Sequence, residues 1–182
     1  MNESREIFKE VILVEDIPEE GIEKIYDDMP GLLDDVEDCW PIGQIAGHIS
    51  LKKIEKGIYV TGDLDVELGL RCHRCLEEYH SHVNVQFSYI LLTWSACEIK
   101  EQIELKSEDM ETTFFDGVEV PVSEFFREQI LLQLPMKQLC SEQCKGLCPG
   151  CGANLNIEQC RCDKKQDDSP FALLKRFKVA GN

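Results

Sequence analysis

Eight of the ten cysteines occur as four closely spaced pairs, and these pairs restrict the possible folds more than any other feature of the sequence. A CxxC loop lets two sulfurs converge on one ion, and four thiolates complete the tetrahedral shell of Zn²⁺. The pattern therefore predicts metal sites that hold distant parts of the chain together. The predicted ligands are Cys72 and Cys75, Cys140 and Cys144, Cys148 and Cys151, and Cys160 and Cys162.

The grouping follows from distance along the chain. The last four cysteines, from Cys148 to Cys162, can close one site on a small loop. Cys72 and Cys75 then need two more ligands, and Cys140 and Cys144 are the obvious candidates. The alternatives are a single site that uses fewer cysteines, His73 as a ligand, and iron in place of zinc. The ferredoxin run C-x2-C-x2-C-x3-C-P is absent, which disfavours a [4Fe–4S] cluster.

The sequence shows no signal for export and no membrane span, so we expect the chain in a reducing compartment. Residues 1–10 are charged and lack the apolar region of a secretory signal, and no apolar run approaches the roughly 20 residues of a membrane span. We therefore expect a soluble, cytoplasmic protein with no membrane association, where structural disulfides are disfavoured. Cys39 and Cys97 have no cysteine neighbour at ligand spacing, and we expect both to be buried thiols.

No motif for catalysis is present. A redox CxxC normally begins a helix in a βαβ unit, whereas Cys72 and Cys75 fall at the tip of a predicted β-hairpin. The sequence also lacks GxGxxG, a phosphate loop, HExxH and GxSxG. We predict no catalytic or cofactor-binding residues other than the metal ligands, and no enzyme activity; thiol redox chemistry is the less favoured alternative.

Apolar residues alternate with polar ones over residues 57–70 and again over 79–93, which predicts two strands with one buried face each. Residues 45–54 resemble a preceding strand, and Asp116–Gly117 indicates a turn. These segments predict an antiparallel sheet or a small open barrel. The polar residues of both segments, among them His80 and His82, should lie on the exposed face.

The helical signals are fewer. Ser123 is a candidate N-cap for a helix that carries Phe126, Ile130 and Leu134 on one face and ends at Pro135. The segment from about Pro18 predicts a helix more weakly, and a short helix is expected from Ser169, with Pro170 at its first position. Residues 97–111 are expected to form an exposed connection.

Together these signals predict an α+β protein with one helix packed on the sheet and a cysteine-rich, metal-stapled C-terminal segment. We place an α+β domain at residues 1–134 and the zinc-binding segment with its short helix at 135–182. Residues 1–133 carry 30 acidic and 11 basic side chains, whereas residues 134–182 carry 5 acidic and 8 basic ones. The net charge of −19 on residues 1–133 suits a basic partner better than it suits RNA, and broad wrapping of RNA is not expected.

The residues REQILLQLPMKQLCSEQCKGLCPGCGANLN (127–156), followed by CRC, resemble the C-terminal signature of the YceD family of large ribosomal RNA subunit accumulation proteins. RCHRCLEEY, FFDGVEV and SPFALLKRF resemble the same family in the same order. The resemblance implies a non-enzymatic role in the accumulation or maturation of 23S ribosomal RNA, and it implies that the eight paired cysteines bind metal. It assigns no RNA-contacting residue.

Two mechanisms fit these expectations. In the first, basic side chains around the cysteine loops contact large-subunit rRNA or a pre-ribosomal particle directly. In the second, the acidic body holds a basic ribosomal protein and the zinc segment acts as a rigid docking end. No small-molecule substrate is implied by either.

Overall fold

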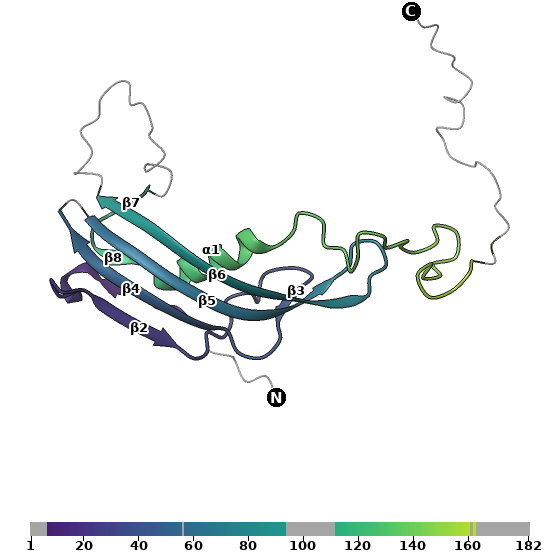
Figure 1. The fold of residues 1–182 in the computed structure, drawn as a ribbon, viewed down its shortest axis with the longest axis horizontal. Coiled ribbons are helices and arrows are strands. Elements are labelled where there is room, and N and C mark those ends of the chain that lie inside the picture. The colour runs from purple at the N-terminus through teal and green to yellow at the C-terminus, as the bar shows by residue number, and fades with distance from the viewer. Residues whose placement is uncertain (1–6, 56, 94–111, 161, 163–182) are drawn as a thin grey trace, which may run out of the picture.

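The computed structural model describes residues 7–55, 57–93, 112–160 and 162. Its main element is a twisted six-stranded sheet with the order β2-β4-β5-β6-β7, in which β3 also pairs with β5 (Figure 1). Only β6 and β7 run parallel; the other pairs are antiparallel. Within the described residues the sheet stays open, with β2 and β7 as its edges, so it is not a closed barrel. The strands are β2 (Ile22–Tyr26), β3 (Cys39–Pro41), β4 (Ala46–Ile54), β5 (Gly57–Arg71), β6 (Glu78–Thr93) and β7 (Thr112–Phe115).

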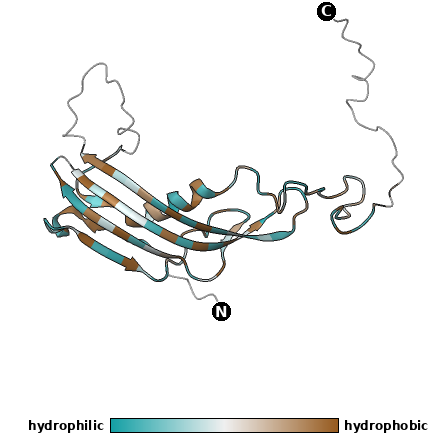
Figure 2. Cartoon of the chain, viewed as in Figure 1, coloured by the Kyte–Doolittle hydropathy of each residue, from teal (hydrophilic) through white to brown (hydrophobic). Residues whose placement is uncertain are grey.

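The long hairpin β5–β6 confirms the period of two. Its strands pair from Gly57 opposite Leu92 to Arg71 opposite Glu78. The even-numbered apolar residues of β5, such as Val60 and Leu68, are fully buried. Bands of opposite hydropathy therefore alternate along these strands (Figure 2). The predicted strand at residues 45–54 is confirmed as β4.

Helix α1 (Val122–Gln133) covers the buried face of the sheet. It buries Val122, Phe125, Phe126, Gln129 and Ile130, which is the spacing of one helical face. Phe126 lies at the centre, with edge-on ring contacts to Tyr26 and Phe87 at centroid distances of 5.8 Å. Gly47 permits this packing, because a Cβ there would lie 2.6 Å from the Phe126 ring.

The start of α1 differs from the prediction. Pro121 occupies the N-cap position, no side chain caps the helix, and Ser123 lies in the first turn. The Ser123 N–H donates to the Glu10 carbonyl instead (3.2 Å), so the main chain of the N-terminal segment takes the place of a capping side chain. The predicted end is confirmed: Leu134 is extended, as expected for a residue before proline.

The helix predicted from Pro18 is wrong. Residues 14–16 form one 3₁₀ turn, Gly21 takes a positive φ of 94°, and Ile22–Tyr26 is strand β2. Pairing with β4 decides the outcome, because Ile22 lies opposite Leu51 at the edge of the sheet. Burial alternates along β2, but Lys24 is half-buried and Ile25 is exposed, so the hydropathy of the sequence does not follow the alternation.

Two short strands form a separate ladder, β1 (Ile12–Leu13) with β8 (Glu119–Val120). The predicted turn before β8 is confirmed, because the Asp116 carboxylate accepts from the Val118 N–H (2.8 Å) and Gly117 has a positive φ of 84°. The expected connection at 97–111, Cys97 and the helix expected from Ser169 lie outside the described residues. Within the described part of the chain, no helix has the length and apolar character that crossing a membrane requires.

Candidate metal centres

The tip of the β5–β6 hairpin presents the first cysteine pair. The Cys72 N–H donates to the Glu77 carbonyl (2.9 Å), and the Leu76 N–H donates to the Cys72 carbonyl (2.9 Å). Leu76 has a positive φ of 61°, which closes the turn. Cys72 and Cys75 are consequently both buried at the tip, 0% and 3% exposed.

The segment after α1 is bound to this tip along its main chain. The His73 N–H donates to the Gln138 carbonyl (2.8 Å), and the Leu147 N–H donates to the Arg74 carbonyl (2.9 Å). The Arg74 guanidinium donates in turn to the Cys144 carbonyl (2.9 Å). Gly146 is needed here, because its φ is +74° and a Cβ would lie 2.9 Å from the Arg74 carbonyl oxygen.

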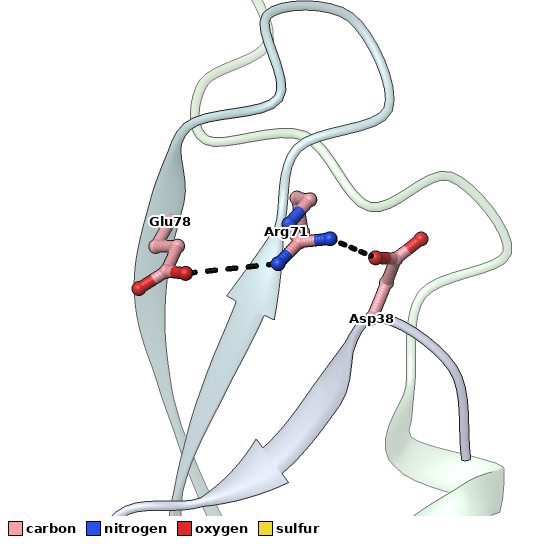
Figure 3. A network of polar contacts seen from close by, with 3 residues as sticks. All are labelled: Asp38, Arg71 and Glu78. Atoms are coloured by element: carbon pink, nitrogen blue, oxygen red, sulfur yellow. Dashed lines mark hydrogen bonds and ion pairs between the residues drawn. The ribbon is translucent and has the colours of Figure 1, made fainter.

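Below the tip, a polar network holds the hairpin to β3 (Figure 3). Arg71 lies between two carboxylates, 3.1 Å from Asp38 and 3.8 Å from Glu78. The Arg71 N–H also donates to the Asp38 carbonyl (3.1 Å). The buried Gln138 side chain also takes part, because its amide nitrogen donates to the carbonyl oxygens of Arg71 and Asp38. This network gives the cysteine-rich end a fixed base on the sheet.

The first centre consists of Cys72, Cys75, Cys140 and Cys144, whose sulfurs all lie within 4.8 Å of one another. Cys72 Sγ is 3.7 Å from Cys144 Sγ, and Cys75 Sγ is 3.7 Å from Cys140 Sγ. A disulfide would need about 2.05 Å. A tetrahedron with Zn–S bonds of about 2.3 Å has edges of about 3.8 Å. The donor set and its spacing therefore fit a four-thiolate metal ion.

The second centre consists of Cys148, Cys151, Cys160 and Cys162, also within 4.8 Å. Cys160 Sγ lies 3.1 Å from Cys148 Sγ and 3.7 Å from Cys151 Sγ. Backbone N–H groups point at the sulfurs, from Gly150 to Cys148 (3.4 Å) and from Cys162 to Cys160 (3.3 Å). Such donors stabilise thiolates, so this smaller and more exposed group also fits a cation.

The thiols of the first centre do not ionise alike. Burial opposes ionisation of Cys72, but backbone N–H groups, including those of Cys140 and Cys75, lower the pKa of its thiol to about 6. Burial and the neighbouring thiols Cys75 and Cys144 raise the pKa of Cys140 to about 12.

The second centre repeats this division. Hydrogen bonds from Cys160 and from the Gly150 N–H lower the pKa of Cys148 to about 6. Contacts with the Cys151 and Cys160 thiols raise the pKa of Cys162 to about 12. Four neighbouring thiols cannot all become thiolates without a compensating positive charge, and a divalent ion supplies it.

The structure thus brings all eight paired cysteines into two groups, the grouping that sequence proximity favoured over a single site. His73 belongs to neither group and is exposed. His80 and His82 are exposed as expected, and Cys39 is a buried free thiol in the core. Sequence spacing gave no sign of Arg74 or Asn156, whose contacts with the first centre depend on tertiary structure.

Comparison with known families adds to this geometry. The model of the family described as "Large ribosomal RNA subunit accumulation protein YceD" matches residues 60–178, which include most of β5, all of β6 and α1, and all eight paired cysteines. The chain belongs to the YceD family. No solved structure shows a significant match to this YceD chain.

Three curated relatives are similar to this YceD chain. "Large ribosomal RNA subunit accumulation protein YCED homolog 1, chloroplastic" of Arabidopsis thaliana is 26% identical over 162 residues, covering 77% of this chain and 49% of the relative. The maize protein of the same name is 42% identical over 61 residues, covering 33% of this chain and 21% of the relative. An uncharacterized protein of Mycobacterium leprae is 24% identical over 111 residues, covering 60% and 48%. The chain thus spans about half the length, or less, of these relatives.

Proposed function

We propose that this chain is a non-enzymatic factor in the accumulation of large-subunit (23S) ribosomal RNA, and that its metal-stapled end carries the surface that meets rRNA or a pre-ribosomal particle. The observation that carries the proposal is the convergence of sulfurs from the hairpin tip and from residues 140–144 on one point. The family description and the names of the plant relatives supply the process.

Zinc is the metal we propose for both centres, with iron as the less favoured alternative. Four thiolates complete the tetrahedral shell of Zn²⁺, and they leave no open position where water or substrate could be activated. With the eight thiols held in this way, the centres would have a structural role. Cys39 would not replace them as a nucleophile, since it is 4% exposed.

The described metal-binding end is not itself basic. Among its residues 134–160 and 162, Lys137 and Lys145 are balanced by Glu142 and Glu158. A four-thiolate zinc site adds about two negative charges by ligand counting. RNA contact would therefore depend on the other six cations of the C-terminal region: Arg161, Lys164, Lys165, Lys175, Arg176 and Lys178.

The acidic sheet favours a second candidate, a protein-interaction module that holds a basic ribosomal protein. Asp63, Asp65 and Glu67 project from the exposed face of β5. Each carboxylate lies within 3.3 Å of a histidine ring nitrogen. This negative face would attract a cationic partner.

A paired experiment tests the role in rRNA accumulation. Cells that carry Cys72→Ser/Cys75→Ser in place of the natural chain should lose 23S rRNA relative to 16S rRNA, and the variant should no longer sediment with large-subunit precursors. Cys39→Ala is the matched control, because it removes a buried thiol outside both centres. Normal 23S rRNA and normal sedimentation in the double variant would overturn the proposal.

A salt titration separates RNA from protein as the direct partner. Binding to an rRNA fragment that depends on the C-terminal cations should weaken steeply with salt, because each neutralised phosphate releases counterions. If only a basic ribosomal protein binds, the interaction module is the correct mechanism and direct RNA contact is wrong.

A further inference from the structure

The loop between two ligands of the second centre also touches the first. Asn156 lies between Cys151 and Cys160 in the sequence, yet its side-chain amide donates to Cys144 Sγ at 3.3 Å. The same side chain accepts from the Lys145 N–H through Oδ1 (2.8 Å). Asn156, in the loop between Cys151 and Cys160, is therefore hydrogen-bonded to Cys144 of the first centre and to the neighbouring Lys145.

Further contacts hold this loop in place. The Leu155 N–H donates to the Gly146 carbonyl (2.9 Å), and Leu147 forms an isolated β-bridge with Asn154. The Asn154 carboxamide oxygen accepts from the Asn156 side chain (2.9 Å), and its nitrogen donates to Glu77 at the hairpin tip (3.2 Å). These contacts hold the loop beside the first centre, where Asn156 meets Cys144.

We propose that Asn156 couples the two centres, so that metal bound at the second raises the affinity of the first. The inference rests on the proposed binding of metal at both. Ligation of Cys151 and Cys160 closes the loop that carries Asn156, which removes much of its conformational freedom before it meets Cys144. An N–H donated to a metal-bound thiolate stabilises it from outside the coordination shell. The coupling is reciprocal by thermodynamic linkage.

The experiment measures occupancy at each centre separately in the full chain. Free zinc is fixed with chelator buffers, unprotected thiols are alkylated, and the modified cysteines are mapped by mass spectrometry. Protection of Cys72 reports the first centre and protection of Cys148 reports the second, because these two thiols ionise most readily when metal is absent. Wild-type chain should show protection of both groups.

Two variants isolate the amide. Asn156→Asp keeps an oxygen to accept from Lys145 but cannot donate to Cys144 or Asn154, and Asn156→Ala loses all three bonds. We expect both variants to lower the zinc affinity of the first centre by roughly 10- to 100-fold. Gln143→Ala is the control: it is exposed and adjacent to Cys144, and its side chain makes no hydrogen bond to another described residue, so affinity should be unchanged.

A double-mutant comparison identifies the coupling itself. Cys148→Ser/Cys151→Ser disables the second centre and should weaken the first by a similar factor, and adding Asn156→Ala to it should cost little more. Cobalt spectra of the Asn156 variants should keep the four-thiolate form, because no ligand is removed. Unchanged first-centre affinity in the Asn156 variants, or fully additive losses, would overturn the coupling while leaving metal binding intact. A wild-type chain that binds no metal would overturn both.

Discussion

Each cysteine group contains a thiol that ionises easily beside others that do not. The pKa is about 6 for Cys72 and Cys148, but about 12 for Cys140 and Cys162. A metal ion that binds near neutral pH must therefore displace protons from the thiols with raised pKa. If the cysteine groups bind metal as proposed, binding and proton release would therefore occur together.

This division predicts the pH dependence of metal binding. Above pH 6, Cys72 and Cys148 are already thiolates, whereas below pH 6 the metal must displace one more proton at each centre. A plot of log affinity against pH should therefore become steeper by about one below pH 6 at each centre. Chelator competition from about pH 5 to about pH 8 measures this slope. An unchanged slope through pH 6 would show that these two thiols do not ionise as the geometry requires.

Cys39 should behave in the opposite way. Burial raises the pKa of its thiol, and the thiolate is the reactive form, so Cys39 should resist iodoacetamide in the native chain near pH 8. Unfolding should expose it to labelling. The internal comparison is Cys148, whose thiol has a pKa of about 6 and should be labelled as soon as a chelator removes metal. Equal labelling of the two thiols in the chelated native chain would contradict the core position of Cys39.

At the scale of elements, α1 and the sheet depend on one another through Phe126. Replacing Phe126 with Ala should lower the free energy of unfolding by about 3–5 kcal/mol, because it removes a fully buried ring and its contacts with Tyr26 and Phe87. Leu132→Ala, at a residue that is 66% exposed on the same helix, should change it by about 0.5 kcal/mol or less. Urea unfolding of the metal-loaded chain gives both values. Similar losses in the two variants would contradict the packing of α1.

The hairpin tip and the segment after α1 should loosen together. Cys72→Ser removes one proposed ligand of the first centre, so residues 140–147 should lose protection from hydrogen exchange, including the Leu147 N–H that donates to Arg74. Cys39→Ala should leave that protection unchanged. If residues 140–147 stay protected in Cys72→Ser, the first centre does not hold the two segments together.

The elements that the sequence predicted are those whose burial repeats locally. Strands β5 and β6 and helix α1 each bury one face, so their apolar residues recur at the period of a strand or a helix. That periodicity alone predicts where these elements lie. Strand β2 was mistaken for a helix because its stability comes from pairing with β4, which no local pattern records. The same holds for the helix start, where Glu10 replaces a capping side chain, and for the contact of Asn156 with Cys144.

At the scale of the whole molecule, the β5–β6 hairpin joins an acidic body to a cysteine-rich end. The sheet and α1 form an acidic body with a continuous apolar core, and residues 140–160 lie beyond the β5–β6 tip at one end of it (Figure 1). The cysteines of the first centre form a second buried cluster there with Tyr79, Leu139 and Leu147. This end has few apolar residues of its own, so metal ligation would supply the stability that its core does not.

Native mass spectrometry of the intact chain, with metal analysis of the same sample, tests this arrangement most directly. We predict two zinc ions per chain and, on addition of a chelator, loss of hydrogen-exchange protection in residues 140–160 while the β5–β6 sheet stays protected. A reduced chain that is free of metal and yet fully protected at residues 140–160 would contradict the metal-stapled structure.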